Sequence, residues 1–88
     1  MIVKIGRSFE KDVSIIKNVK IHKQIFNLVE DIKKAASIEA IKNIKKLKGY
    51  KSHYRIRIGD YRAGLHINDN TVEFIRFLHR KDIYKRFP

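Results

Sequence analysis

The fold is decided by one stretch of the sequence, His53-Tyr54-Arg55-Ile56-Arg57-Ile58-Gly59-Asp60-Tyr61-Arg62-Ala63-Gly64-Leu65-His66-Ile67. Apolar and polar residues alternate along it in two runs, and the pair Gly59-Asp60 separates these runs. Alternation with a period of two is typical of a strand with one buried face, and a Gly-Asp pair suits the two-residue turn of a hairpin. The stretch therefore predicts two antiparallel strands joined by a tight turn.

A two-residue turn also determines which residues of this hairpin face each other. The predicted pairs are Ile58 with Tyr61, Arg57 with Arg62, Ile56 with Ala63, Arg55 with Gly64, Tyr54 with Leu65 and His53 with His66. One face is then apolar, and the other carries the arginines and histidines, with a gap at Gly64 beside Arg55. Directly opposed like charges, with Cβ atoms about 4.5–5.5 Å apart, destabilise a sheet. We therefore interpret the opposed arginines as a phosphate site; the alternative is a solvated arginine face.

A third strand is predicted from Thr71 to Leu78, after a turn at Asn68-Asp69-Asn70. A three-residue turn places Arg76 beside Arg62. The same turn directs two apolar side chains into the core, Ile75 and Phe77. A turn one residue longer or shorter sends every side chain to the other face, and the sequence leaves the register open.

The strand ends at the rim of the predicted sheet with His79 and Arg80, and a short tail follows. If the tail is helical, Tyr84 lies one turn after Arg80 and on the same side. For Arg80 the alternative is a local ion pair with Asp82. For Tyr84 the alternative is that its ring docks the tail onto the core.

The N-terminal half predicts one strand and two helices. Met1 to Ile5 alternates as a strand, and Ser8 is the expected cap of a helix over about residues 9–18. Apolar residues with helical spacing predict a longer second helix: Ile21, Ile25, Leu28, Val29, Ile32 and Ala36. The segment Ser37 to Gly49 is either a further short helix or a lysine-rich connection. We expect an α+β fold of order β-α-α-β-β-β, with two helices packed on one face of a mainly antiparallel sheet.

Composition narrows the class of protein. The chain has 88 residues, 21 Lys and Arg against 9 Asp and Glu, a formal net charge of +12 and no Cys. Disulfide scaffolds, thiolate zinc fingers and thiol catalysis are thereby excluded. No apolar run approaches the roughly 20 residues that span a bilayer, and no signal peptide is recognisable. We expect one soluble, cytoplasmic domain over residues 1–88, without membrane contact, whose partners are polyanions.

The charge is concentrated in the C-terminal half, which carries six of the seven arginines. Arginine offers a planar fork of donors that suits phosphate oxygens. Further basic residues are candidates for RNA binding: Lys45, Lys46, Lys48, Lys51, His53, His66, Arg76 and Lys81. The alternatives are a solvated lysine face, which would include Lys42, and ordinary surface histidines. No carboxylate accompanies the histidines, so we expect neither a metal nor another cofactor.

The chain resembles the RelE/ParE family of bacterial toxins from type II toxin–antitoxin systems in three segments: Lys45-Lys46-Leu47-Lys48-Gly49, Tyr54-Arg55-Ile56-Arg57-Ile58-Gly59-Asp60-Tyr61-Arg62 and His79-Arg80-Lys81-Asp82-Ile83-Tyr84. The likeness covers essentially the whole chain, and its specific part is the C-terminal half. In RelE-type members the toxin enters the ribosomal A site and cuts mRNA. The 2′-hydroxyl attacks the adjacent phosphate and leaves a cyclic or 3′-phosphate end. The resemblance implies this endoribonuclease activity here, together with a cognate antitoxin and a ribosome carrying mRNA as partners.

The resemblance also implies roles for individual residues. Arg55 and Arg57 match basic residues of the second strand, one of which is proposed as general base, and Arg62 matches the arginine that holds the scissile phosphate. Arg80 matches the residue proposed to stabilise the transition state or to protonate the leaving 5′-oxygen, and Tyr84 matches a tyrosine that stacks on the mRNA base.

The general base stays open at this point. An arginine with a pKa above about 12 is a poor base. Either the role of the arginines is electrostatic or a histidine accepts the proton, and His79, beside Arg80, is the best histidine candidate. Two other functions also remain open. ParE-like members of the family poison DNA gyrase on the same fold, and a non-catalytic RNA-binding module would use the same residues.

Overall fold

Five strands and three α-helices follow one another along residues 1–88, all of which the computed structural model describes. The elements are β1 (Ile2–Ile5), α1 (Arg7–Ser14), α2 (Val19–Lys34), a single 3₁₀ turn (Ile38–Ala40), β2 (Ile44–Lys46), β3 (His53–Ile58), β4 (Tyr61–Asn68), β5 (Thr71–His79) and α3 (Ile83–Arg86). The strands form one sheet of order β1-β5-β4-β3-β2, in which only the β1–β5 pair is parallel. The expected α+β fold with a mainly antiparallel sheet is confirmed.

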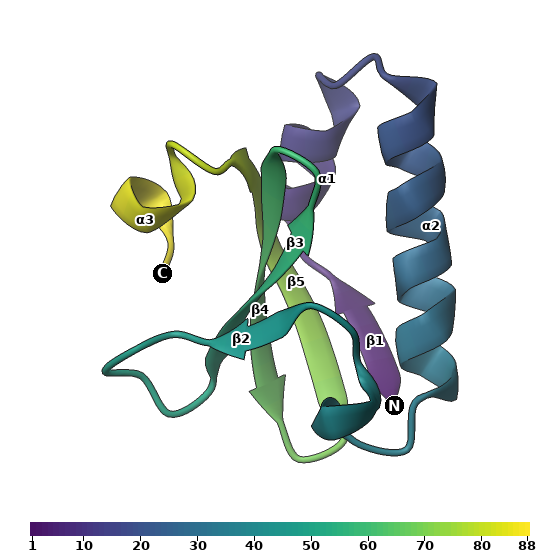
Figure 1. Ribbon diagram of the computed structural model, residues 1–88, viewed down its shortest axis with the longest axis vertical. Helices are drawn as coiled ribbons and strands as arrows, with labels where there is room; N and C mark the ends of the chain where they lie inside the picture. The colour runs from purple at the N-terminus through teal and green to yellow at the C-terminus, as the bar shows by residue number, and fades with distance from the viewer.

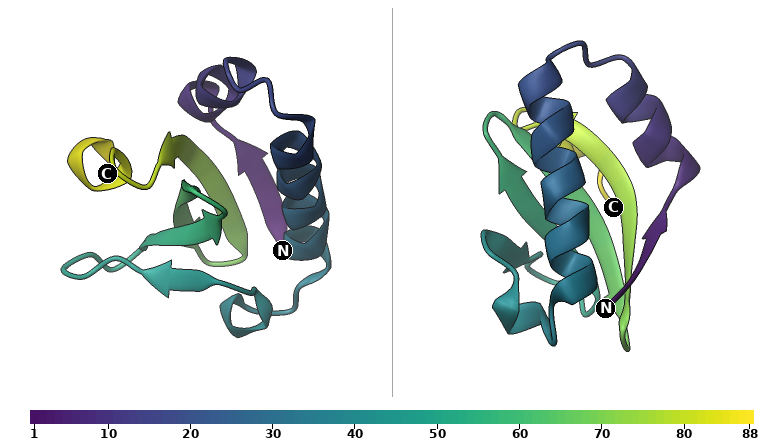
Figure 2. Two further views of the ribbon diagram at one scale, coloured as in Figure 1. Left: turned by 45° about the horizontal axis from the view of Figure 1, so that its top comes forward. Right: turned by 90° about the vertical axis from the view of Figure 1, so that its right-hand side faces the viewer.

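The sheet separates two layers of unequal size. Helices α1 and α2 cover one face, while α3 and the loop between β2 and β3 lie on the opposite side (Figures 1 and 2). The main core lies between the sheet and the two long helices, and its largest fully buried side chains include Phe74, Phe77 and Ile32. No helix is both long and apolar enough to cross a membrane. The sheet face beneath α3 is therefore the one that remains partly open for a site.

The hairpin pairs as the sequence predicts. All six pairs of β3 and β4 are found, from Ile58 opposite Tyr61 to His53 opposite His66. The turn has two residues, and Gly59 has a φ of +57°, which suits the first central position of a type II′ turn. Because this turn is local, its register depends on nothing distant in the chain.

The pairing of β4 with β5 differs from the expected three-residue turn. The turn has two residues, since Asn68 pairs with Thr71, and a β-bulge then interrupts the ladder between Gly64 and Leu65. The bulge leaves Ile75 without a partner, so Arg76 lies opposite Gly64 and not beside Arg62. Phe77 is in the main core as predicted. Ile75 instead packs on the other side of the sheet, because the extra residue reverses the alternation there.

The two long helices begin and end at different residues from those expected. Helix α1 begins at Arg7 and ends at Ser14; its N-cap is Gly6, and the expected cap Ser8 lies inside the helix. The backbone N–H of Gly6 donates to the carbonyl of Phe74, so the helix starts directly where β1 leaves the sheet. Helix α2 begins after Asn18, whose side chain accepts from the N–H groups of Lys20 and Ile21. Its buried residues include Ile21, Ile25 and Ile32, as the periodicity predicts.

The segment Ser37 to Gly49 contains a strand that the predicted element order lacks. After the 3₁₀ turn, Asn43 adopts a φ of +61° and redirects the chain into β2, which pairs with β3 from Ile44 opposite Ile56 to Lys46 opposite Tyr54. A strand of three residues is too short to show an alternating pattern. The lysine-rich connection is thus the outer edge of the sheet.

A second, smaller hydrophobic cluster attaches the C-terminal tail to the sheet. We call it the tail cluster: Leu78, Ile83 and Phe87 are buried in it, and Leu47 and Ile75 pack against it. The tail is helical from Ile83 to Arg86, as the sequence analysis allowed. The cluster holds α3 across the face of the sheet that α1 and α2 leave uncovered (Figure 2).

Candidate nucleic-acid interface

Three arginines of the hairpin share the sheet face that carries α3, and we call this the basic face. Arg57 lies directly opposite Arg62, and Arg55 lies opposite Gly64. Side chains alternate between faces along a strand, so these guanidinium groups point away from the main core. The arrangement places like charges in the least favourable cross-strand positions.

Arg62 is the centre of this group of charges. Its Nη1 donates to the carbonyls of Gly59 (3.0 Å) and Tyr61 (2.9 Å), while its Nε is buried with no hydrogen-bond partner. Burial is the largest cause that lowers the pKa of Arg62, followed by the positive charges of Arg55 and Arg57; Arg80 lowers it further. A buried donor without an acceptor is unusual in a folded protein. Arg62 remains cationic at neutral pH.

Arg62 and the three arginines that act on it form a cluster, which consists of Arg55, Arg57, Arg62 and Arg80. No carboxylate neutralises this cluster. The ion pairs of the structure are Lys33 with Glu30 and Arg76 with Asp12, and neither involves the basic face. The expected alternative for Arg80, a local pair with Asp82, is not formed. The cluster therefore offers an uncompensated positive field that suits a phosphate group.

The tail brings Tyr84 to the same place. Its ring lies under the guanidinium of Arg55, with 5.6 Å from Cζ to the ring centroid, which is a cation–π distance. Tyr84 is 62% exposed, whereas Ile83 directly before it and Phe87 three residues after it are buried in the tail cluster. Ile83 and Phe87 anchor the tail to the sheet. Tyr84 is therefore not the residue that docks the tail, which was the alternative role. Its ring stays available to a ligand.

The gap expected at Gly64 is filled. The ring of Phe87 packs on Gly64, where an added Cβ would come within 2.8 Å of the ring carbons Cγ and Cδ2. Gly64 thus provides the space for the tail, and phosphate cannot enter beside Arg55 at this point. The sequence could not indicate this contact because Phe87 lies 23 residues after Gly64 and meets it only when the tail folds back.

The candidate base His79 does not lie on the basic face. It pairs with Tyr61 at the end of the β4–β5 ladder, and the two rings meet edge to face at 5.8 Å. Tyr61 itself stacks on the core residue Phe77. His79 therefore points to the helix side of the sheet, and its Nδ1 accepts from the N–H of Lys81. Adjacency in sequence to Arg80 was misleading, because neighbouring strand residues point to opposite faces.

The other two candidate histidines do share the basic face. His53 and His66 oppose each other with ring centroids 5.2 Å apart, and His53 also meets the ring of Phe87 at 5.6 Å. Burial, and secondly the charge of His66, lower the pKa of His53, so its imidazole is neutral at pH 7. The pair is part of the aromatic surface beside the arginines.

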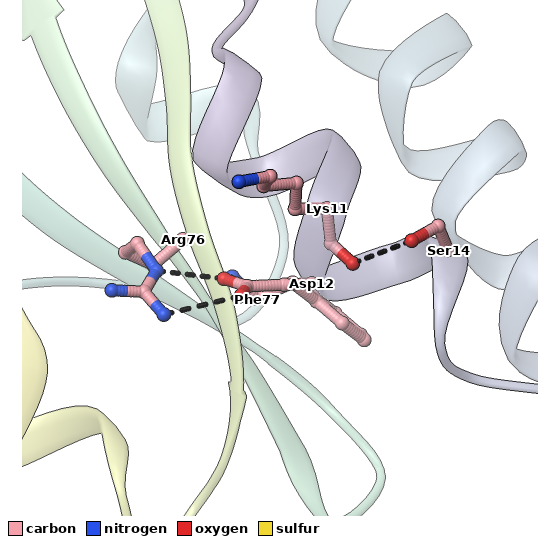
Figure 3. Close-up of polar contacts among 5 residues, drawn as sticks. All are labelled: Lys11, Asp12, Ser14, Arg76 and Phe77. Carbon is pink, nitrogen blue, oxygen red and sulfur yellow. Dashed lines mark hydrogen bonds and ion pairs between the residues drawn. The ribbon is translucent and has the colours of Figure 1, made fainter.

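Arg76 is removed from the basic cluster by an ion pair. Its Nε and Nη2 donate to the two carboxylate oxygens of Asp12, at 2.7 and 3.1 Å, and the N–H of Phe77 donates to the same carboxylate at 2.9 Å (Figure 3). Asp12 thereby provides an acceptor for the N–H of Phe77, at the edge of β5 beyond the end of β1. The separation of 64 residues between Asp12 and Arg76 hides this pair from sequence reasoning.

The candidate lysines lie on β2, in the loop after it and just before α3. Those of β2 and the following loop are all exposed and free of ion pairs, as is Lys81: Lys45, Lys46, Lys48 and Lys51. Lys45 pairs with Arg55 and so projects on the basic face, whereas Lys46 pairs with Tyr54 and projects on the other. One aromatic residue of this segment, Tyr50, was not among the candidates predicted from the sequence. A signal was present, because residues 40–59 include seven Lys and Arg but no Asp or Glu.

Comparison with known proteins agrees with this architecture. Residues 3–84 match the family model described as the ParE toxin of the type II toxin–antitoxin system parDE. Toxin RelE3 of Methanocaldococcus jannaschii is 42% identical over 89 residues, which cover 100% of both chains. The crystal structure of the RelB–RelE antitoxin–toxin complex from Methanococcus jannaschii matches with a TM-score of 0.82 and 39% identity, over 97% of this chain and 99% of that chain.

A more distant structure shares the fold alone. The archaeal RelE–RelB complex from Pyrococcus horikoshii OT3 matches with a TM-score of 0.72 and 20% identity, over 90% of this chain and 93% of that chain. The family model and the 42% identical relative both extend over almost the full length of the sequence. This chain belongs to the RelE/ParE family, the toxins of type II toxin–antitoxin systems.

Proposed function

We propose that this toxin is a ribosome-dependent endoribonuclease that cuts mRNA in the A site. The observation that carries the proposal is the cluster around Arg62: three further arginines act on its guanidinium, no carboxylate compensates them, and one buried donor is free. A purely structural sheet face has no need of opposed arginines, since they lower its stability. A site that gains negative charge during a reaction does need them.

The reaction that fits the cluster is internal transfer at a phosphate. The ribose 2′-oxygen forms a bond to the adjacent phosphorus, the bond from phosphorus to the 5′-oxygen breaks, and the products are a 2′,3′-cyclic phosphate and a 5′-hydroxyl. The pentacoordinate intermediate carries more negative charge than the substrate. Guanidinium donors held in place before the reaction therefore stabilise it more than the ground state.

Within this reaction we assign each residue a role. Arg62 holds the scissile phosphate through its positive charge, and Arg80 donates hydrogen bonds to the phosphorane and to the departing 5′-oxygen, which takes its proton from water. Arg55 and Arg57 add positive charge, and the exposed ring of Tyr84 stacks on a base of the mRNA. Lys45, Lys48 and Lys51 attract the RNA backbone.

The proton of the 2′-hydroxyl is accepted by solvent in this mechanism. His79 lies on the other side of the sheet, and an arginine is too weak a base. The cluster instead lowers the pKa of the 2′-hydroxyl by stabilising the alkoxide, so that water or hydroxide removes the proton. Arg55 and Arg57 thus act electrostatically.

A cognate antitoxin is the second partner that we propose. A related toxin was crystallised together with its antitoxin, in the RelB–RelE complex. For the present chain, the uncompensated basic face would bind an acidic, amphipathic segment that folds on contact. Co-expression with the neighbouring reading frame, followed by purification of the complex, tests this partner. Failure to co-purify with any neighbouring product contradicts it.

The cleavage assay decides the main proposal. The protein is added to programmed ribosomes, and the cut ends of the mRNA are mapped. We expect cuts within the A-site codon, and a rate roughly 100- to 1,000-fold lower for Arg62→Ala, as for loss of one preorganised donor. Arg7→Ala is the matched control, because Arg7 is an exposed arginine of α1 without an ion pair. Absence of cleavage by the parent protein overturns the proposal.

A gyrase target is the alternative that one observation favours, the match to a family model described as a ParE toxin. That function predicts inhibition of DNA supercoiling that persists after Arg80→Ala and Tyr84→Ala, without cuts in mRNA. The uncompensated arginines favour the nuclease, and the two assays separate the targets.

A further inference from the structure

Tyr50 is an exposed aromatic residue at the border of the basic face. It lies in the loop between β2 and β3, is 47% exposed, and makes no side-chain hydrogen bond. The loop projects on the same side of the sheet as α3, which carries Tyr84 (Figure 1). We propose that the ring of Tyr50 stacks on an RNA base and forms a second platform beside Tyr84. This inference rests on the RNA-directed function proposed above.

The loop holds Tyr50 in a defined position. The N–H of Tyr50 donates to the carbonyl of Leu47 at 3.2 Å, and Gly49 between them has a φ of +86°. A positive φ at the third position is typical of a type II turn, and glycine adopts it without strain. The N–H of Leu47 donates in turn to the carbonyl of His53 at 2.8 Å, which closes the base of the loop. The ring is therefore presented by a short closed loop and loses little freedom on binding.

The loop is also fastened to the tail. Leu47 packs against the tail cluster, and the ring of Tyr50 meets the ring of His53 edge to face at 5.4 Å. His53 in turn contacts Phe87 at 5.6 Å. Because its pKa is lowered, His53 is neutral at pH 7 and supports Tyr50 as an aromatic neighbour. Contacts through His53 and Phe87 thus connect Tyr50 to the tail that carries Tyr84.

The surroundings of Tyr50 favour nucleic acid as its ligand. Lysines flank it on both sides, at Lys48 and Lys51, and no carboxylate occurs from residue 40 to residue 59. Sites for single-stranded nucleic acid combine positive charge of this kind with aromatic side chains on which bases stack. His53, which contacts Tyr50, lies four residues before Arg57 on β3. This spacing corresponds to about 13 Å along the strand. A short stretch of RNA can therefore extend from Tyr50 to the arginine cluster.

The test measures base stacking separately from cleavage. Programmed ribosomes carry an mRNA with 2′-O-methyl groups in the A site, which prevent cutting, and 2-aminopurine at one position at a time. Stacking on a ring quenches the fluorescence of 2-aminopurine. The compared proteins are the parent, Tyr50→Ala, Tyr50→Phe and Phe26→Ala. Phe26 is the matched control, because it is 66% exposed but lies on α2, on the other side of the sheet.

We expect Tyr50→Ala to bind the ribosome roughly 5- to 150-fold more weakly, the range for one base–aromatic stack. Tyr50→Phe keeps the ring and should bind like the parent, as should Phe26→Ala. Quenching lost at one mRNA position places the stacked base in the mRNA. Weaker binding with unchanged fluorescence places it in ribosomal RNA, and both results support the platform.

Three results overturn the inference, and they differ from one another. If the parent cleaves unmodified mRNA while Tyr50→Ala binds and quenches like the parent, the platform is wrong and the nuclease stands. If Tyr50→Ala loses affinity only for the co-expressed antitoxin, the ring is a protein contact. If the parent neither binds nor cuts, the proposed function and the platform both fail.

Discussion

The ring of Phe87 lies directly on Gly64, so closely that a Cβ at Gly64 would approach ring carbon Cγ to 2.8 Å. This contact joins the end of the chain to the middle of the sheet and determines where α3 carries Tyr84. Phe87 is 5% exposed and Gly64 is buried, so neither has room to move aside. The position of the tail therefore depends on the absence of one methyl group.

We expect Gly64→Ala to detach the tail. The added methyl overlaps the ring, and overpacking of this kind costs about 1–3 kcal/mol. Cleavage should fall with it, because Tyr84 loses its place beside Arg55. Urea unfolding measures the stability, and the ribosome assay measures the activity. In a Phe87→Ala background the same substitution should cost almost nothing, because the ring is gone; equal costs in both backgrounds contradict the contact.

Arg57→Thr should separate stability from function. Replacing one of two opposed arginines removes a like-charge pair, and such pairs change stability by about 0.2–1 kcal/mol. Threonine also suits a strand. We therefore expect a higher midpoint of urea unfolding together with slower cleavage. The stability gain should shrink at 1 M salt, where the charges are screened. A variant that is less stable at low salt shows that the opposed arginines are not in repulsion.

Asp12→Ala should be among the most destabilising single substitutions. It leaves the guanidinium of Arg76 and the N–H of Phe77 without their partner, in a pair whose side chains are 20% and 14% exposed. We expect a loss of about 3 kcal/mol, the lower end of the range for breaking a buried pair. Urea unfolding of the variant and of the parent protein measures this difference in the free energy of unfolding.

An exposed ion pair provides the control for Asp12. Glu30 pairs with Lys33 at 3.1 Å, with side chains that are 39% and 55% exposed. Glu30→Ala should change stability by less than about 1 kcal/mol, as is usual for surface pairs. If the two alanine variants unfold at the same urea concentration, the proposed role of Asp12 at the edge of β5 is wrong.

Acid should weaken the attachment of the tail through His53. Burial and His66 lower the pKa of His53 below its ordinary value of 6.5. Between the lowered folded pKa and the unfolded value, the unfolded state binds more protons, so stability falls as the pH decreases below about 6.5. Urea midpoints from pH 7.5 to pH 5 report this decline. His53→Gln should flatten it, while an unchanged slope in that variant assigns the decline to other groups.

The dependence of cleavage on pH tests the proton acceptor. If solvent accepts the proton of the 2′-hydroxyl, the rate rises with pH through the region near 6.5 without a histidine inflection. His79→Gln should then leave the profile unchanged, because His79 lies on the helix side of the sheet. An inflection that disappears in this variant identifies His79 as the base after all. Single-turnover cleavage on programmed ribosomes provides the measurement.

Much of the fold follows from local properties of the sequence. The alternation of β3 and β4 and the pair Gly59-Asp60 predicted every pair of the hairpin, because a tight turn determines its own register. The spacing of Ile21, Ile25 and Ile32 likewise predicted the buried side of α2. The arginine cluster on the hairpin was predictable for the same reason, since the period of two places Arg55, Arg57 and Arg62 on one face.

Residues whose positions depend on distant contacts could not be placed from the sequence. A three-residue turn would have placed Arg76 beside Arg62, and the sequence left this register open; a bulge at Ile75 places Arg76 opposite Gly64, and Asp12 binds it. His79 was the histidine candidate for the base because it is next to Arg80 in the sequence, but its ring faces the helices. The short strand β2 was missed because three residues show no period.

The sequence by itself determined the hairpin, the two long helices and the concentration of arginine on one sheet face. Only the tertiary structure decided which arginines are free, where His79 points, and that Phe87 fills the space at Gly64. The physical reason is the range of the forces involved. Strand alternation, helical spacing and tight turns act between neighbours in the chain, and the order of residue types reveals them. A bulge, an ion pair across 64 residues and the docking of a tail depend on packing between segments that meet only after folding.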